Sequence, residues 1–280
     1  MRFALVESKK VEASPGAVGM CPGCGQPMVA KCGLQRVHHW AHRRMACDPW
    51  WEPETEWHRT WKNNFPTDWQ EVFLPDERTG EKHIADVRTP HGLVVEFQHS
   101  HIDPHERTTR ERFYQDMVWV VDGKRLKSDY LRFIKGGKNY IQSLHNGMHN
   151  VYNPNRCFPK GWLNSTVPVI FDFGGLETVD DKKGRRNSLC CLFPGRFGNH
   201  ARLAAFPREV FVNSVISGQW SEGVRRVLDK LPQAEPPMEE IPYQAKEPPV
   251  TQKVFVRIKR RPSPYVYDHR KGKLVRRKRF

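Results

Sequence analysis

No stretch of the 280-residue chain approaches the roughly 18–20 consecutive apolar residues that cross a bilayer as a helix. The first residues, MRFALVESKKVEA, also lack the basic, apolar and small-residue order of a secretory signal. We therefore expect a cytoplasmic protein with no membrane partner. Aromatic residues make up 11% of the chain and include nine tryptophans, so a hydrophobic core can form despite 28% charged residues.

Acidic residues are almost absent from the C-terminal end. Residues 251–280 hold twelve Lys and Arg but one acid, so +11 of the formal net charge of +15 lies there. A concentrated cationic segment is typical of proteins that bind polyanions, and nucleic acid is the first candidate; a solvated tail without a partner is the alternative. Apolar and polar residues alternate in parts of 251–280, and this segment is expected to be either a basic tail or a basic hairpin. The candidate contacts are Lys259, Arg260, Arg261, Arg276, Arg277 and Lys278.

The rest of the chain divides by composition. Residues 1–50 hold a Cys/His cluster and are expected to have little regular structure, residues 51–135 predict a compact α/β unit, residues 136–231 have no assigned role, and residues 232–250 form a linker with six prolines. Within 51–135 the patterns predict a helix over 54–65, strands over 70–74, 83–88 and 92–98, a helix over 104–117 and a buried strand over 118–123. A further strand is expected near 167–173 and a helix near 221–231.

The early cysteines and histidines have metal-ligand spacing. CPGCG places Cys21 and Cys24 two residues apart at a tight turn, where both thiolates can reach one tetrahedral ion. HHWAH follows, and either His39 or His38 could join His42 to complete a Cys2His2 zinc site. Residues 28–40 between them predict a β-hairpin. Cys32 and Cys47 are spare ligand candidates, or small buried hydrophobic residues. We take Cys21, Cys24, His39 and His42 as the predicted structural zinc ligands.

The predicted strand over 92–98 carries polar side chains inside an apolar run. Successive strand residues point to opposite faces, so Val95 and Phe97 share one face and Glu96 and Gln98 the other. An edge strand with its polar face in solvent is the simpler interpretation. The sharper one is a catalytic cleft, because Asp86 lies ten residues before Glu96 in the preceding predicted strand.

This D–x9–E–x–Q pattern on consecutive strands resembles the PD-(D/E)XK nuclease superfamily. The resemblance implies that Asp86 and Glu96 bind Mg²⁺ or Mn²⁺ and that Gln98 stands where that family usually has Lys. Two carboxylates with open coordination positions suit Mg²⁺, which keeps several waters and also binds phosphate oxygens. Gln98 forms hydrogen bonds but cannot neutralise charge, so another cation is needed, and His58 or Lys62 is available.

A longer series of motifs resembles the competence protein CoiA-like family over roughly residues 15–122. The series comprises CPxCG, HHWAH, E–x–E–x–H–x3–K (Glu54, Glu56, His58, Lys62), Glu71, Asp86, VEFQHS, R–x3–Y (Arg110, Tyr114) and VWVVD. The family combines a zinc-finger-like N-terminal region with a PD-(D/E)XK nuclease core. The resemblance implies that Glu71, His58 and Lys62 face the metal cleft, and that Arg110 and Tyr114 hold a phosphate.

These observations give an expected fold and function. The fold is α+β or α/β, with a restriction-endonuclease-like core over 51–135, a zinc-finger-like module over 1–50 and a C-terminal extension. The function is metal-dependent hydrolysis of single- or double-stranded DNA, with DNA rather than RNA implied by the resemblance. The alternatives are a non-catalytic zinc-containing nucleic-acid-binding protein and, less favoured, a scaffold that binds protein through 136–231. A second copy or another protein remains open as a partner.

Overall fold

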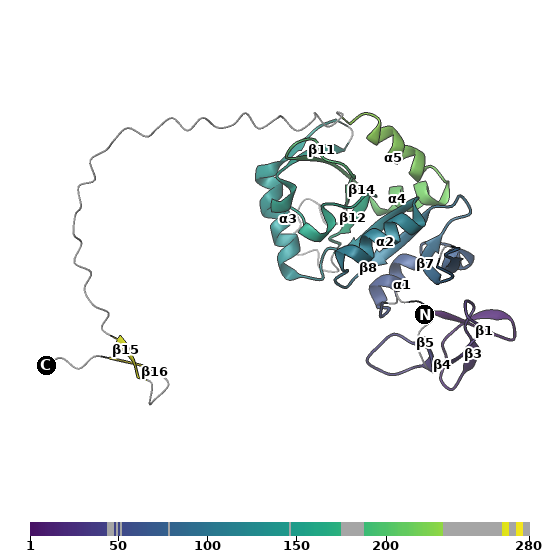
Figure 1. Ribbon diagram of the computed structural model, residues 1–280. Helices are drawn as coiled ribbons and strands as arrows, with labels where there is room; N and C mark the ends of the chain where they lie inside the picture. Colours follow the sequence, from purple (N-terminus) through teal and green to yellow (C-terminus); the bar gives the residue numbers. More distant parts are fainter. Residues whose placement is uncertain are drawn as a thin grey trace, which may run out of the picture. The chain divides into compact units, whose positions relative to one another are not determined.

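The structure of the chain is a computed structural model that describes residues 1–43, 48, 50, 52–77, 79–145, 147–174, 188–231, 265–268 and 273–276 (Figure 1). Two compact units divide the chain, Met1–Pro237 and Met238–Phe280. In the second unit β15 (Tyr265–Asp268) and β16 (Lys273–Arg276) form an antiparallel hairpin. Arg276 ends this hairpin. The linker 232–250 and the candidate contacts Lys259, Arg260, Arg261, Arg277 and Lys278 lie outside the described residues.

Five antiparallel strands form a sheet at the N-terminus, in the order β2-β1-β3-β4-β5. They are β1 (Phe3–Val6), β2 (Lys9–Glu12), β3 (Val18–Met20), β4 (Pro27–Lys31) and β5 (His39–His42). Residues 1–50 therefore contain more regular structure than their composition suggests, whereas the hairpin expected over 28–40 is confirmed as β4 and β5. Ala4, Met28 and Trp40 form the buried centre of this small sheet.

A mixed nine-stranded sheet forms the centre of the first unit, in the order β10-β11-β14-β13-β12-β9-β8-β7-β6. Its strands are β6 (Gln70–Pro75), β7 (Lys82–Arg88), β8 (Val94–Gln98), β9 (Met117–Asp122), β10 (Ile141–Ser143), β11 (Met148–Tyr152), β12 (Val169–Asp172), β13 (Ser188–Leu192) and β14 (His200–Pro207). β9 pairs in parallel with β8 and β12, and the other pairs are antiparallel. One sheet thus contains strands from both 51–135 and 136–231, the two regions that the sequence analysis separates at residue 135.

Helices cover both faces of this sheet (Figure 1). They are α1 (Glu56–Lys62), α2 (Pro104–Tyr114), α3 (Lys127–Tyr140), α4 (Arg208–Ile216) and α5 (Trp220–Leu228), with short 3-10 turns η1 (Thr67–Trp69), η2 (Pro154–Arg156) and η3 (Lys160–Trp162). On one face Trp61 of α1 and Phe211 of α4 pack with Val95 and Phe97 of β8. On the other face Tyr114 of α2 packs with Trp119 of β9.

The start and the end of α2 each have a local cause. The Asp103 side chain accepts the His105 and Glu106 amides at 2.8 and 3.3 Å and so caps α2, with Pro104 in the first turn. α2 ends three residues before the expected position, where Gln115 adopts a φ of 58°.

No helix among the described residues is both long and apolar enough to span a membrane.

Candidate functional site

β8 is an interior strand, which decides between the two interpretations of its polar side chains. It lies between β7 and β9, and Glu96 and Gln98 are only 3% and 4% exposed. The alternation is confirmed, because Val95 and Phe97 belong to the core cluster on the other face. The interpretation of this segment as an edge strand with a solvated polar face is therefore wrong. Buried carboxylates need partners, and the neighbouring strand and helices supply them.

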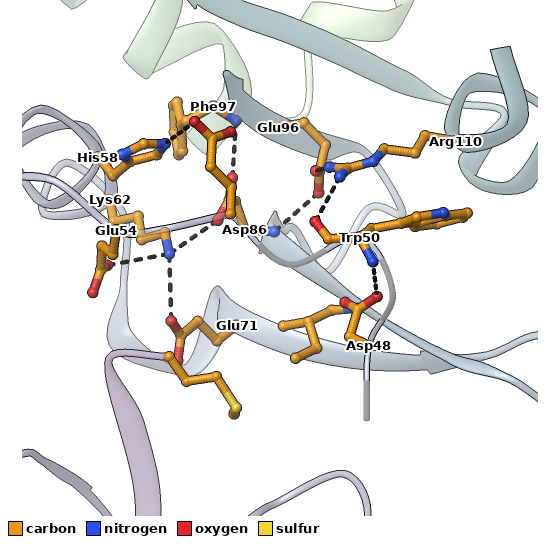
Figure 2. A pocket seen from close by; sticks show the side chains of 13 residues that line it. Asp48, Trp50, Glu54, His58, Lys62, Glu71, Asp86, Glu96, Phe97 and Arg110 are labelled. Carbon is orange, nitrogen blue, oxygen red and sulfur yellow. Dashed lines mark hydrogen bonds and ion pairs between the residues drawn. The ribbon is translucent and has the colours of Figure 1, made fainter. Parts of the chain in front are cut away.

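Asp86 and Glu96 interrupt the ladder between β7 and β8. The paired register runs through Arg88–Val94 and Val87–Val95. Beyond it the Phe97 amide donates to Asp86 Oδ2 at 2.9 Å, and the Asp86 amide donates to Glu96 Oε1 at 3.1 Å. Side-chain carboxylates thus take backbone donors that a continuous ladder gives to carbonyls. The two acids are fixed side by side where the strands separate (Figure 2).

Lys62 reaches this point from α1. Its Nζ lies 2.9 Å from Asp86 Oδ1, 3.3 Å from Glu54 Oε1 and 3.4 Å from Glu71 Oε1 (Figure 2). Burial favours the neutral amine, but the surrounding carboxylates outweigh it and raise the Lys62 pKa above its ordinary value. Lys62 is therefore a fixed positive charge at the centre of the cleft.

His58 does not supply that charge. It is buried, and its Nδ1 accepts the Thr55 amide at 3.1 Å at the start of α1. Because an amide nitrogen only donates, neutral His58 carries its proton on Nε2. Burial lowers the pKa of His58 to about 4 despite the nearby Asp86 charge, so the ring is neutral at pH 7. Of the two cations considered from sequence, the structure favours Lys62.

Glu71 is held by the N-terminal strand as well as by Lys62. Its Oε1 accepts the Arg2 amide at 2.7 Å, and its Oε2 accepts the Phe3 amide at 3.0 Å. Burial raises its pKa, but Lys62, the N-terminal amine and these amides together lower it. Glu71 also adopts a φ of 48°, which is unusual for a side chain other than glycine. It joins the N-terminal sheet to the cleft.

Glu96 of β8 and Arg110 of α2 are in direct contact inside the cleft. Glu96 Oε2 lies 3.1 Å from Arg110, whose guanidinium also donates to Trp50 O at 2.6 Å and to Glu106 at 2.5 Å. Burial and the Asp86 charge raise the pKa of Glu96 to about 8, against the opposing effect of Arg110. Arg110 therefore orients a cleft acid, and both terminal nitrogens of its guanidinium already have protein acceptors, while its buried Nε has none among the described residues.

Tyr114 is 8% exposed and lies beneath the cleft. Its ring makes an edge contact with Trp50 at 6.0 Å between centroids. Burial and the Glu96 charge raise its pKa well above 10. Tyr114 is not among the residues that line the cleft, unlike Arg110.

Gln98 turns its amide toward a residue that sequence reasoning missed. Its Nε2 donates to Glu52 Oε2 at 2.6 Å, and the Ser100 amide donates to Glu52 Oε1 at 2.6 Å. Gln98 Oε1 is buried without a hydrogen-bond partner among the described residues. Burial raises the pKa of Glu52, and Asp86 adds to this effect. The acid-rich WEPETE stretch before α1 was the available signal, but only Glu54 and Glu56 were singled out in it.

The cleft formed by these side chains has a cavity volume of about 60 Å³. Six carboxylates line it, from Asp48, Glu52, Glu54, Glu71, Asp86 and Glu96, together with the two permanent cations Lys62 and Arg110. Negative charge is therefore in excess. The space holds a few waters or one hydrated ion, not a nucleotide. Carboxylate oxygens, surplus negative charge and room for waters are the features by which a cleft could hold a divalent cation.

A second cluster lies in the N-terminal sheet. Ligand atoms of Cys21, Cys24 and His42 all lie within 4.8 Å of one another, and Cys24 Sγ is 3.3 Å from His42 Nε2. The Gly25 amide donates to Cys21 O at 2.9 Å, which closes the turn that brings both thiols together. This Cys2His group could hold zinc. Among the described residues, it is the one group of three or more Cys, His, Asp or Glu side chains whose ligand atoms lie this close to one another.

The prediction that His39 is the fourth ligand is not supported. His39 and His42 belong to strand β5, where residues three apart point to opposite faces, rather than to a helical turn. His39 Nδ1 instead lies 2.9 Å from Val37 O. The alternative, His38, is exposed before β5 and is also outside the group. Cys32 is likewise outside it, and Cys47 lies beyond the described residues.

The two clusters are physically connected. Lys82 of β7 donates to Gly23 O at 2.7 Å in the CPGC turn. Gly23 also approaches Phe73 of β6 so closely that a Cβ at this position would lie 2.0 Å from the ring. The N-terminal sheet is thus attached to the strands that carry the cleft, at the turn and at Glu71.

Comparison with known proteins adds no assignment: no family model matches the chain, and neither a curated protein nor a solved structure matches it.

Proposed function

We propose that this chain is a metal-dependent deoxyribonuclease with a PD-(D/E)XK-like core, related to the competence protein CoiA-like family. The observation that carries the proposal is the position of Lys62 Nζ, 2.9 Å from Asp86 Oδ1 in the cleft that Glu96 also lines. The acid, acid and lysine that the superfamily motif requires are thus present together. The lysine comes from α1, and Gln98 stands at its usual place.

Asp86 and Glu96 would hold the metal ion, either Mg²⁺ or Mn²⁺. When bound, such an ion lowers the pKa of a water ligand and stabilises charge on a phosphate. Lys62 supplies a fixed positive charge for the phosphate oxygens or holds the attacking water through its N–H groups. Arg110 keeps the Glu96 carboxylate in place. Neutral His58 offers a donor at Nε2 rather than a base.

The Cys21, Cys24 and His42 group has a structural part in the proposal. Zinc there would stabilise a small sheet with few buried side chains. Because Arg2 and Phe3 bind Glu71, folding of this sheet also organises the cleft. The basic C-terminal unit would add affinity for DNA phosphates.

The runner-up is a non-catalytic zinc-containing DNA-binding protein. One observation favours it: every oxygen of Asp86 and Glu96 already accepts a protein donor, and burial raises the Glu96 pKa to about 8. A satisfied site of this kind can be structural. The experiment below separates the two functions.

The test is cleavage of labelled linear, circular and single-stranded DNA by the zinc-loaded full chain, with Mg²⁺, Mn²⁺ or no divalent ion. We expect metal-dependent products that disappear in Glu96→Gln. Glu222→Gln, an exposed substitution on α5, is the matched control and should cleave normally. Folded wild-type protein that binds DNA but cleaves none of the substrates would favour the binding protein.

A further inference from the structure

A polar pocket lies in the region 136–231, outside the cleft. It has a volume of about 400 Å³ and lies among η2, η3 and the loop before β14. Its functional groups are the Lys160 ammonium, the Arg196 guanidinium and the amides of Asn153, Asn155, Asn164 and Asn199. None of the residues that line it is acidic.

The walls of this pocket are fixed by hydrogen bonds between distant segments. Asn153 adopts a φ of 49°, and its amide donates to Asn199 O at 3.0 Å. The Arg196 guanidinium donates to Leu163 O at 2.9 Å, which orients it along the pocket wall. The groups are therefore brought together by the fold, although they are more than forty residues apart in sequence at the extremes.

The positive charge in this pocket has no acidic partner. Neither Lys160 nor Arg196 forms an ion pair with any residue that the structure describes, although eleven pairs between Lys or Arg and an acid occur elsewhere among those residues. Partial burial lowers the pKa of Arg196, so the protein pays a desolvation cost for this charge that a bound anion would offset. Amides add donors and acceptors that match phosphate oxygens and sugar hydroxyls.

We propose that this pocket binds a backbone phosphate of the DNA strand outside the cleavage cleft. The proposal rests on the proposed nuclease function and names a contact for its substrate. Arginine, lysine and asparagine side chains are typical phosphate partners in protein–DNA complexes. Helix α2 contacts both the pocket wall and the cleft, because Asn164 O accepts Arg107 of α2 at 3.2 Å, and one turn later Arg110 of α2 contacts Glu96.

The experiment measures DNA affinity in the Glu96→Gln background without divalent ions, so that cleavage does not interfere. Lys160→Gln with Arg196→Gln is compared with Lys135→Gln and Lys138→Gln, an equal charge change at two exposed lysines of α3. Fluorescence anisotropy with single- and double-stranded oligonucleotides is recorded over a range of KCl concentrations. We expect the pocket pair to weaken binding about tenfold and reduce the slope of log affinity against log salt by about 1–2. Equal effects of the two pairs would overturn the proposal.

A second variant protects the test against misfolding. Asn155→Asp places a carboxylate at the exposed wall and should weaken DNA binding, whereas Asn139→Asp on α3 should have a smaller effect. Inorganic phosphate and a mononucleotide serve as competitors. Displacement of DNA only at millimolar concentrations supports a strand contact. Micromolar binding of either small anion that disappears in the pocket pair would overturn it in favour of a small-molecule site.

The outcomes also separate this proposal from the proposed function. If wild-type protein cleaves DNA but the pocket pair leaves DNA affinity unchanged, the pocket proposal fails alone. If wild-type protein does not cleave but the pocket pair weakens DNA binding, the nuclease fails and the phosphate site stands.

Discussion

The Asp86 amide donates to the Glu96 carboxylate at 3.1 Å, while the Asp86 carboxylate accepts the next amide of β8, that of Phe97. This exchange fixes two acids at a strand separation and leaves one charge, on Lys62, between three carboxylates. The charged side chains of the cleft therefore depend on one another, and replacing any one of them should destabilise the protein. Its first test is to remove the cation.

Lys62→Met should destabilise the protein by about 3 kcal/mol or more, because it leaves buried carboxylates without their counter-charge. It should also abolish any metal-dependent DNA cleavage. Urea unfolding measures the first effect. Lys138→Met, an exposed lysine on α3, is the control and should change stability by less than about 0.5 kcal/mol. Normal stability of Lys62→Met would show that the three acids do not depend on this charge.

Glu96 should make stability fall as pH rises. Its pKa is about 8 in the folded protein against an ordinary value of 4.5, so between these values the folded state holds a proton that the unfolded state has released. Its contribution is complete below pH 4.5 and decreases as pH rises through 8, a loss of about 1.5–2 kcal/mol between pH 6.5 and 8. His58 acts in the opposite direction, but its contribution is complete above pH 6.5.

Unfolding by urea at several pH values in this window, without divalent ions, measures the effect. Glu96→Gln keeps the size of the side chain and lacks the proton, so its stability should be nearly independent of pH there. A slope that persists in Glu96→Gln would assign the pH dependence to another group.

The sequence predicted the parts of this site that depend on local periodicity. Alternation along β8 separated Val95 and Phe97 from Glu96 and Gln98, and the residue pattern over 54–65 located α1. It did not predict Glu52, which is held by Gln98 and Ser100 some fifty residues away. It placed His39 among the zinc ligands, because HxxH spacing suits a helical turn, whereas pairing with β4 makes this segment a strand. Long-range pairing has no local sequence signal.

The zinc content of purified variants should depend on the three side chains that the structure brings together, not on the HxxH spacing in the sequence. His42→Ala removes a member of the Cys21, Cys24 and His42 group, so purified protein should lose most of its bound zinc. His39→Ala, three residues earlier on the other face of β5, should retain it. Metal analysis after dialysis measures both. Equal zinc loss in the two variants would return His39 to the ligand set.

Gly23 should tolerate no side chain. A Cβ there would lie 2.0 Å from Phe73 of β6, so Gly23→Ala should force the CPGC turn away from the sheet and cost about 1–3 kcal/mol. Gly33→Ala, in the β4–β5 loop, is the matched control and should be neutral, because an added Cβ there would have no neighbouring atom within 4 Å. Thermal unfolding of both variants, zinc-loaded, gives the comparison. If Gly23→Ala unfolds like wild type, the turn and the sheet do not make this contact.

Asp172 of β12 gives the region 136–231 a structural role, because it holds helix α1. Its Oδ2 accepts the indole N–H groups of Trp57 and Trp61 at 3.2 and 2.9 Å and pairs with Arg208 at 2.9 Å. These donors lie on α1 and α4, so a C-terminal strand holds the helix that carries Lys62.

Asp172→Ala should therefore destabilise the protein by about 3 kcal/mol, because it leaves two indole donors and a guanidinium without their acceptor. DNA cleavage should fall further than stability alone explains, since α1 loses its anchor and Lys62 its position beside Asp86. Cleavage at a temperature where the variant is still folded, with the exposed substitution Asp229→Ala alongside, measures this. Full activity in a folded but weakened Asp172→Ala would show that α1 is positioned by packing alone.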